Sequence, residues 1–213
     1  MYYKAGDHKQ AGLTYSPFKA LIAPRPIGWI STCDDKGHDN LAPYSFFNAI
    51  SEIPPMVMFV SAPDSRASTD DASQHQPKDS LRNIQQTGEF GVNIVGQTQL
   101  QQMIDSSATL PAHQDEFAAV GLGKMPAKDI RPSLVAGAPA HLECALHQII
   151  DLPGTNERAG CKMVLGRVLS IHIDDAVITD GKVDVTRFQP AARLGYKDYA
   201  IIRDVFAAGI SSS

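Results

Sequence analysis

The chain has 213 residues, of which 43 % are hydrophobic and 20 % charged, a balance typical of a globular protein rather than a disordered chain. Its formal net charge is −4, and its lysines and arginines are scattered, so no basic field points to nucleic acid. No apolar run approaches membrane-spanning length and the first ten residues are polar, so we expect neither a membrane span nor a signal peptide.

The three cysteines, Cys33, Cys144 and Cys161, are an odd set without CxxC spacing. They resemble neither a disulfide framework nor a zinc cluster, and no other pattern predicts a metal. We therefore expect three free thiols in a reducing cytoplasm.

The first predicted structure is a hairpin with a long loop. Residues 27–33 form a β-prone run, a turn-rich loop follows, and residues 41–50 continue as a second strand. Pro54 and Pro55 interrupt the chain, because proline donates no hydrogen bond to a sheet. The apolar run 56–61 then predicts a buried strand.

Residues 63–78 are polar and predict a loop. Asp79 and Ser80 can begin a helix, and Gly88 ends it. Further along the chain the patterns predict a strand over residues 89–95 and helices over 97–105 and 115–120.

The C-terminal third predicts mainly antiparallel strands, over residues 138–152, 162–174, 176–178 and 182–184, the first two joined by a glycine-rich turn. Short strands with turns between them and a few helices favour a closed or nearly closed β barrel with helical decoration. With no internal repeat and no low-complexity linker, a single domain over residues 1–213 is expected.

Several common catalytic motifs are absent. There is no GxGxxG after a strand, no GxSxG and no HExxH, and "GVNIVG" lacks the Lys-Ser/Thr of a phosphate loop. His141 and His147 would share one face of a strand. They could be metal ligands, but a pair of surface or interface histidines is the favoured interpretation.

The stretch "NLAPYSFFNAIS", residues 40–51, is the first candidate site. With Ser31 and Thr32 it combines hydroxyls, aromatic rings and backbone that Pro43 keeps from full pairing. A planar heterocycle with polar edges requires that mixture. An edge strand with a bulge at Pro43 explains the same residues, and both interpretations stay open.

Two further segments carry candidate binding groups. Lys78, Ser80 and Arg82 cluster at a predicted helix N-terminus, which suits a phosphate, although an ordinary capped helix is the commoner meaning. Arg193 lies in a near-terminal loop over residues 187–200, where it can pair with an acidic group, cover a ligand or be a plain surface arginine.

In chain order, "RPIGWIST", "NLAPYSFFNAISEIPPMVMFV", "KDSLRNIQQTGEFGVNIV", "DEFAAVGL", "APAHLECAL", "VLGRVLSIHIDD" and "ARLGYKDYA" resemble the flavin reductase-like, FMN-binding split-barrel family, which includes flavoredoxins and NAD(P)H:flavin oxidoreductases. The resemblance covers residues 23 to about 200. It implies a mainly β, six-stranded antiparallel Greek-key split barrel, a homodimer, and FMN bound near the dimer interface.

The resemblance also implies cofactor contacts, with no catalytic side chain of the protein's own. The implied FMN-binding residues are Arg25, Ser31, Thr32, Ala42, Pro43, Tyr44, Ser45, Asn48, Ser61, Lys78, Ser80 and Arg193. Ser61, Lys78, Ser80 and Arg25 would hold the phosphate end, and residues 42–45 the ring and the ribityl tail. Tyr196 stands where the family pattern Arg-Leu-Gly-Gly has its second glycine, which puts substrate access in question.

The implied activity is hydride transfer from NAD(P)H to the flavin N5, as in an NAD(P)H:flavin reductase. One alternative is a flavoredoxin-type electron carrier that works with a redox partner protein and has no nicotinamide step. Another is a non-catalytic barrel that acts in protein interaction.

Overall fold

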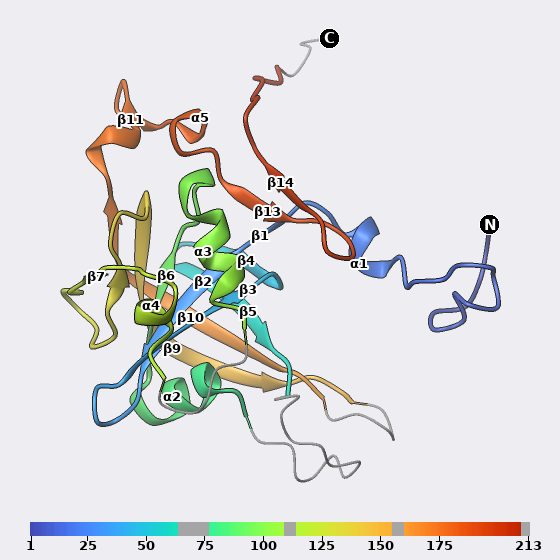
Figure 1. Ribbon diagram of the computed structural model, residues 1–213, viewed down its shortest axis with the longest axis horizontal. Helices are drawn as coiled ribbons and strands as arrows, with labels where there is room; N and C mark the ends of the chain where they lie inside the picture. The colour runs from blue at the N-terminus through green and yellow to red at the C-terminus, as the bar shows by residue number, and fades with distance from the viewer. Residues whose placement is uncertain (64–76, 109–113, 155–159, 210–213) are drawn as a thin grey trace.

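The computed structural model describes residues 1–63, 77–108, 114–154 and 160–209. At its centre is a seven-stranded antiparallel sheet in the order β3-β2-β6-β9-β10-β5-β4, which curls into a barrel (Figure 1). Its strands are β2 (Gly28–Cys33), β3 (Asp39–Tyr44), β4 (Phe47–Glu52), β5 (Pro55–Ser61), β6 (Glu89–Asn93), β9 (Ala140–Asp151) and β10 (Lys162–Ile173). The predicted mainly β architecture is confirmed.

The strand predicted over residues 41–50 is two strands. The chain turns at Ser45 and Phe46, so that β3 pairs with β2 while β4 pairs with β5, at opposite edges of the sheet. The N–H of Val60 donates to the carbonyl of Phe46 (2.9 Å) beside this corner. The sheet has seven strands, whereas the resemblance implies a six-stranded barrel. Pairing of β3 with β2 shows no register shift, so the alternative of a bulge at Pro43 is wrong.

The helices lie close to their predicted positions. α2 (Asp79–Thr87) ends at Gly88, which adopts φ +73° and donates its N–H to the carbonyl of Ile84. The others are η2 (Gln97–Gln99), α3 (Leu100–Asp105) and α4 (Glu116–Ala119). None of the helices in the described ranges is long and apolar enough to cross a membrane. Most of the loop predicted over residues 63–78, and part of the turn after residue 152, lie outside the described residues.

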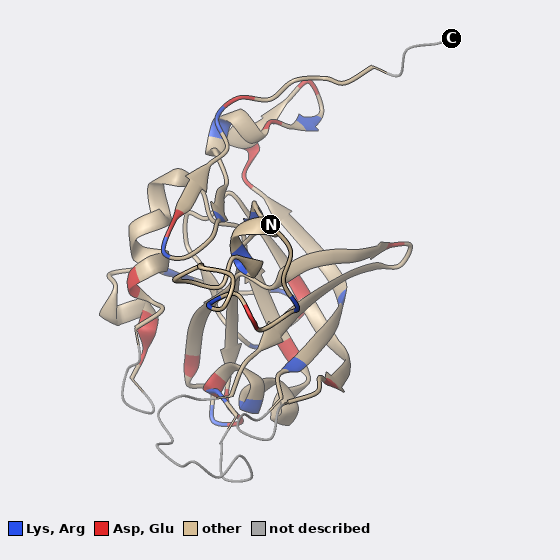
Figure 2. Ribbon diagram, turned by 90° about the vertical axis from the view of Figure 1, so that its right-hand side faces the viewer, with Lys and Arg blue, Asp and Glu red and all other residues tan. Residues whose placement is uncertain are grey.

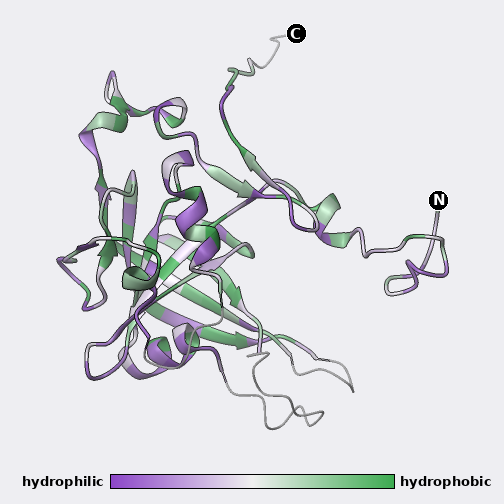
Figure 3. Ribbon diagram, in the orientation of Figure 1, coloured by the Kyte–Doolittle hydropathy of each residue, from purple (hydrophilic) through white to green (hydrophobic). Residues whose placement is uncertain are grey.

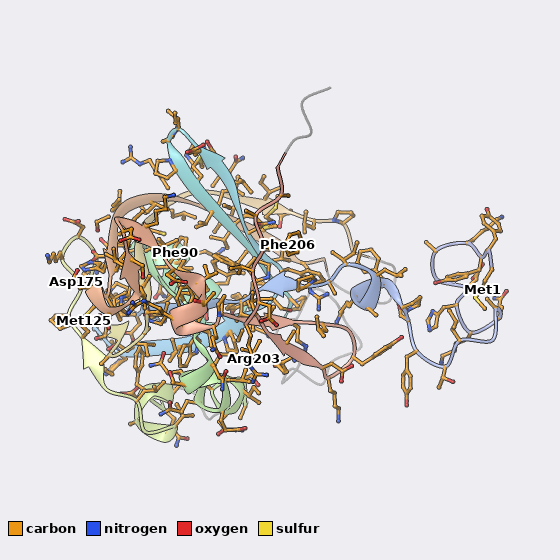
Figure 4. The ribbon with its side chains drawn as sticks, turned by 90° about the horizontal axis from the view of Figure 1, so that it is seen from above. Met1, Phe90, Met125, Asp175, Arg203 and Phe206 are labelled. Carbon is orange, nitrogen blue, oxygen red and sulfur yellow. The ribbon has the colours of Figure 1, made fainter. Side chains whose placement is uncertain are left out.

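Alternate residues of β2 and β3 supply two hydrophobic cores. Ile30 and Tyr44 point into the barrel, where they join Phe59 and Phe90, whereas Trp29 and Leu41 join the outer core under α3 and α4. Phe90 is labelled inside the barrel in Figure 4, and Figure 3 shows the apolar strands around that interior. Deleting a buried ring such as that of Phe90 typically costs about 3–5 kcal/mol.

A separate three-stranded sheet, β1-β13-β14, stands beside the barrel, with α1 against it (Figure 1). It comprises α1 (Phe18–Leu21), β1 (Arg25–Pro26), β13 (Ala191–Arg193) and β14 (Tyr199–Ile201). The loop predicted over residues 187–200 is therefore partly strand. These strands are too short for an alternating pattern to reveal, and Ala191 and Ala192 are buried as part of the sheet.

The remaining elements are β7 (Lys124–Met125), β8 (Leu134–Val135), η3 (Asp175–Val177), β11 (Ile178–Thr179), β12 (Lys182–Val183) and α5 (Val185–Phe188). The three cysteines are free thiols, as predicted. His141 is buried and bonds to the carbonyl of Val135, so it is not the surface histidine that was favoured. His147 is exposed on β9.

Candidate functional site

The predicted site residues divide between the two faces of β3. Ala42 and Tyr44 pack against the barrel interior. The side chain of Asn40, near the start of β3, reaches Ser80 of α2. Pro43 and Ser45 line a pocket outside the barrel. The stretch singled out in the sequence thus contributes to two polar sites, an inner cluster and an outer pocket.

The inner cluster lies where α2 closes one end of the barrel. The side-chain amide of Asn40 donates to the Ser80 hydroxyl (2.9 Å), and that of Asn83 donates to the Thr32 hydroxyl (3.1 Å). All four side chains are buried. Thr32 and Ser80 were named as contacts from the sequence, whereas Asn40 lay in the candidate stretch without an assigned contact and Asn83 was not named. The spacing of Asn83 three residues after Ser80, which places both on one helix face, was the available signal.

Tyr44 brings an unsatisfied group to this cluster. Its hydroxyl is buried and has no hydrogen-bond partner among the described residues. Burial raises the pKa of Tyr44, and the nearby hydroxyls of Ser80 and Ser61 only partly offset that effect. Because buried polar atoms are nearly always hydrogen-bonded, the Tyr44 hydroxyl marks a place where a polar ligand atom fits.

Ser61 and Lys78 stand on either side of the segment that precedes α2. Ser61, at the end of β5, is buried and donates weakly to the carbonyl of Ala62 (3.4 Å). Lys78 is the N-cap residue of α2, and its side chain makes no capping bond. The first turn of α2 has N–H groups without helical partners, so a cation there favours an anion.

The outer pocket has a volume of about 120 Å³. It is lined by Ile27, Pro43, Ser45, Met103, Ser107, Arg193 and Tyr199, and we call it the Arg193 pocket. The guanidinium carbon of Arg193 lies 4.4 Å from the centre of the Tyr199 ring, and Arg193 donates to the Tyr199 hydroxyl and to the Tyr196 carbonyl (2.6 Å). These contacts fix the direction of the guanidinium. Ile27, Met103, Ser107 and Tyr199 were not predicted.

Arg25 has a different role from the one that was expected. Its guanidinium donates to the backbone carbonyls of Lys19, Ile22 and Leu194, the last at 2.7 Å. Burial, and secondly the charge of Arg193, lower the pKa of Arg25. These bonds fasten α1 to the turn between β13 and β14. Arg25 therefore holds backbone segments together through its two terminal nitrogens, whereas its buried Nε has no partner among the described residues.

Ser31 and Asn48 do not line the Arg193 pocket. The Ser31 hydroxyl is buried and accepts from the side-chain amide of Asn93 (3.2 Å). Asn48 is exposed on β4, and its side-chain oxygen accepts from the N–H of Ala49 (2.9 Å). Ser31 thus links β2 to the Asn93 side chain of β6, and Asn48 stabilises the local backbone of β4.

A second pocket, of about 180 Å³, has the opposite character. Its lining includes the carboxylates of Asp34, Asp35, Asp39, Asp79 and Glu116, together with Lys36, His38 and Arg82. Within the described part of the chain, no group of three or more side chains is arranged to hold a metal ion. Figure 2 shows acidic and basic residues interspersed over the ribbon rather than gathered on one basic face.

A model of the family described as "Flavin reductase like domain" matches residues 21–189. A Deinococcus radiodurans protein described as uncharacterized is 35 % identical over 203 residues, covering 92 % of this chain and 83 % of its own. Nitrilotriacetate monooxygenase component B from Bacillus cereus superposes with a TM-score of 0.84 at 25 % identity over 98 % of both chains. The 2-nitrobenzoate 2-nitroreductase of Pseudomonas fluorescens gives 0.79 at 27 % identity, over 100 % of this chain and 97 % of that one.

Proposed function

Because this chain belongs to the flavin reductase-like family, we propose that it is an FMN-dependent oxidoreductase that accepts a hydride from NAD(P)H. Its antiparallel barrel is the split-barrel fold of its structural relatives. The family supports flavin-linked oxidoreductase chemistry in general. FMN as the flavin, NAD(P)H as the donor and the binding residues are our proposal.

The observation that carries the proposal is the free edge of β3. Among the described strands β3 pairs only with β2, so no strand covers its other edge, where the Leu41 N–H donates to the Glu116 carboxylate (3.1 Å). Pro43 lies on this strand and has no N–H to donate, which discourages a further strand from pairing there. The edge runs between the Arg193 pocket at Ser45 and the inner cluster at Asn40. A flat heterocycle with a polar rim and a polar tail matches that arrangement.

The two ends of the edge suit different parts of FMN. Backbone groups of residues 42–45 suit the rim of the ring. Ser61, Lys78 and Ser80, beside the unsatisfied Tyr44 hydroxyl, suit the ribityl-phosphate tail, because Lys78 brings positive charge to the helix N-terminus.

When bound, the flavin supplies the hydride chemistry itself. The chain's contribution is to hold the ring, to exclude water from its inner face and to present backbone N–H groups to charge that develops on it. This division of labour requires no general acid of the protein's own.

The proposal is tested with purified full-length protein that has been incubated with FMN or FAD and then dialysed. We expect retained flavin absorbance at about 450 nm with FMN, and loss of nicotinamide absorbance at about 340 nm when NADH or NADPH is added. Retained FMN without nicotinamide oxidation would favour a flavoredoxin-type carrier. A protein that retains no flavin would contradict both functions and favour the interaction barrel.

We also propose that the protein is a homodimer. Several apolar side chains are exposed near α1 and β4, namely Phe18, Leu21, Ile22, Phe46 and Ile53. Exposed apolar surface marks interaction sites, so we expect a second copy of the chain to cover it. A mass of twice 23.0 kDa by light scattering is expected. The free thiols suit a reducing compartment, so we place the protein in the cytoplasm.

A further inference from the structure

We propose that the Arg193 pocket is a recognition subsite for the carboxylate of a small, single-ring aromatic substrate. The inference rests on the proposed function, because it names the class of compound that meets the flavin beside the β3 edge. Three properties of the pocket carry it: its charge, the setting of Arg193, and its size.

The charge of the pocket selects an anion. Arg193 is its sole charged lining residue in the described part of the chain, although the chain as a whole has a net charge of −4. The neighbouring cation, Arg25, is the Cα partner of Arg193 across β1 and β13, and its charge adds to the same field. By contrast, several carboxylates, including those of Asp79 and Glu116, line the second pocket and disfavour an anion there.

Arg193 is held ready for a planar anion. It has no carboxylate partner among the described residues, and its guanidinium is fixed by the Tyr199 ring and the Tyr196 carbonyl. Its remaining N–H donors are therefore available in a fixed direction. A guanidinium binds carboxylate through two parallel hydrogen bonds, which a fixed side chain forms at lower entropic cost than a free one.

The size and the walls of the pocket suit one ring. An enclosed apolar protein cavity of about 150 Å³ is known to hold benzene, so about 120 Å³ in a pocket that is open on one side is the scale of a single ring. Ile27, Pro43 and Met103 form the apolar wall. Ser45 and Ser107 add hydroxyl groups on the polar side. A flavin ring therefore lies along the edge of β3, and a smaller ring enters the pocket.

The test is calorimetric titration of the full-length protein with benzoate, without flavin and then with saturating FMN. We expect saturable benzoate binding in both states and much weaker binding of benzamide, which has the same shape without the charge. Arg193→Gln should weaken benzoate binding at least about tenfold, the usual scale for a lost charge-assisted hydrogen bond, and Arg193→Lys should weaken it less. Arg187→Gln, an exposed arginine paired with Asp184, is the matched control and should bind benzoate normally.

A second variant protects the test against misfolding of Arg193→Gln. Ser107 is exposed at the pocket, so Ser107→Phe should fold normally and fill the space, and it should also abolish benzoate binding. Equal binding of benzoate by the parent and by both pocket variants, or equal binding of benzamide, overturns the subsite. Competitive displacement of benzoate by FMN also overturns it, because the pocket would then belong to the flavin. Arg193-dependent benzoate binding in a protein that retains no flavin contradicts the proposed function and leaves the subsite standing.

Discussion

Arg25 and Arg193 lie directly opposite each other in the pairing of β1 with β13, yet their guanidinium groups have different partners. Arg25 is 5 % exposed and donates to three backbone carbonyls, whereas Arg193 lines the outer pocket against Tyr199. Two like charges on adjacent strands repel, so each must be held by other contacts. Arg25 is held by carbonyl dipoles, and Arg193 by the ring and hydroxyl of Tyr199 and by the Tyr196 carbonyl.

The role of Arg25 is tested by Arg25→Met, which keeps the length of the side chain and removes its donors. We expect the free energy of unfolding to fall by about 2–4 kcal/mol, because the carbonyls of Lys19, Ile22 and Leu194 lose their partner. Urea unfolding measures this. Arg203→Met, at an exposed arginine with one long hydrogen bond, is the control and should change stability little. If the folded Arg25→Met protein has unchanged stability but no longer binds FMN, Arg25 binds the phosphate of FMN as the sequence predicted.

Tyr196 occupies the left-handed backbone region, with φ +54°. Glycine adopts this conformation freely, whereas a residue with a Cβ is strained by about 1–2 kcal/mol, which explains the preference for glycine in the family pattern. Tyr196→Gly should therefore be more stable than Tyr196→Ala by about 1 kcal/mol, although both remove the ring and its contact with Tyr15. Equal urea midpoints for the two variants would argue against the left-handed conformation. If the ring limits access, both variants should raise the turnover of bulky electron acceptors.

Glu143 makes the free energy of unfolding depend on pH. It is fully buried on β9, and its carboxylate accepts hydrogen bonds from the N–H groups of Lys128 and Asp129 and from the His172 ring. Burial raises the pKa of Glu143, but these donors outweigh it, so the pKa lies below its usual value of 4.5. The stabilisation is present above the unfolded-state pKa and is lost as the pH falls through the lower, folded-state pKa.

We therefore expect Glu143→Gln to lower the free energy of unfolding by about 2–4 kcal/mol at neutral pH. The glutamine has an NH2 group in place of one carboxylate oxygen, and that group cannot accept a hydrogen bond from the N–H groups of Lys128 and Asp129. The difference from the parent should shrink in urea titrations carried out below about pH 4. Glu52→Gln, on exposed β4, is the control and should follow the parent at every pH. A constant difference across the acid range would refute the carboxylate's role.

The proposed FMN site predicts that replacing Ser45, at the ring edge, and Lys78, at the phosphate tail, together by alanine weakens FMN binding. We expect a loss of about tenfold or more that grows smaller at high salt, because Lys78 acts through its charge. Equilibrium dialysis with FMN measures it. Lys182→Ala, on the exposed β12 strand, is the control for a lost positive charge. Unchanged FMN affinity in the folded double variant would remove both residues from the site.

The thiols should differ in reactivity. Burial raises the pKa of Cys144 to about 12, and Cys33 is also buried with a raised pKa, whereas Cys161 is half-buried. Since the thiolate is the reactive form, a disulfide reagent should modify Cys161 first and the other two only after unfolding. Cys161→Ser should abolish the fast phase. A fast phase that persists in this variant would mean that a core cysteine is accessible.

Local patterns were sufficient for the elements whose signals are local. The helix that ends at Gly88 and the long strands of the C-terminal third follow from alternation and from helix-terminating residues. The corner at Ser45 and Phe46 was missed, because both residues suit a strand and no glycine or proline marks the change of partner. Strand partners are a long-range property that periodicity does not report.

The site was predictable in part for the same reason. Thr32 and Ser80, both named from the sequence, lie in the inner cluster, because hydroxyls in a strand and at a helix N-terminus stand out in a sequence. Asn40 was missed, because its role depends on α2 folding back on β3. The partners of Arg25 were also missed, because they are backbone carbonyls, which no residue pattern encodes.

The corner between β3 and β4 has a consequence for folding. β3 and β4 follow each other in the chain but are the two outermost strands of the sheet. Both therefore reach their final positions only when the strands between them have paired. A ligand that requires the β3 edge and the end of β5 together therefore binds only the completely folded molecule. Such a ligand stabilises the whole sheet by mass action, and saturating FMN should slow amide hydrogen exchange even in β9, which contributes no residue to the proposed site.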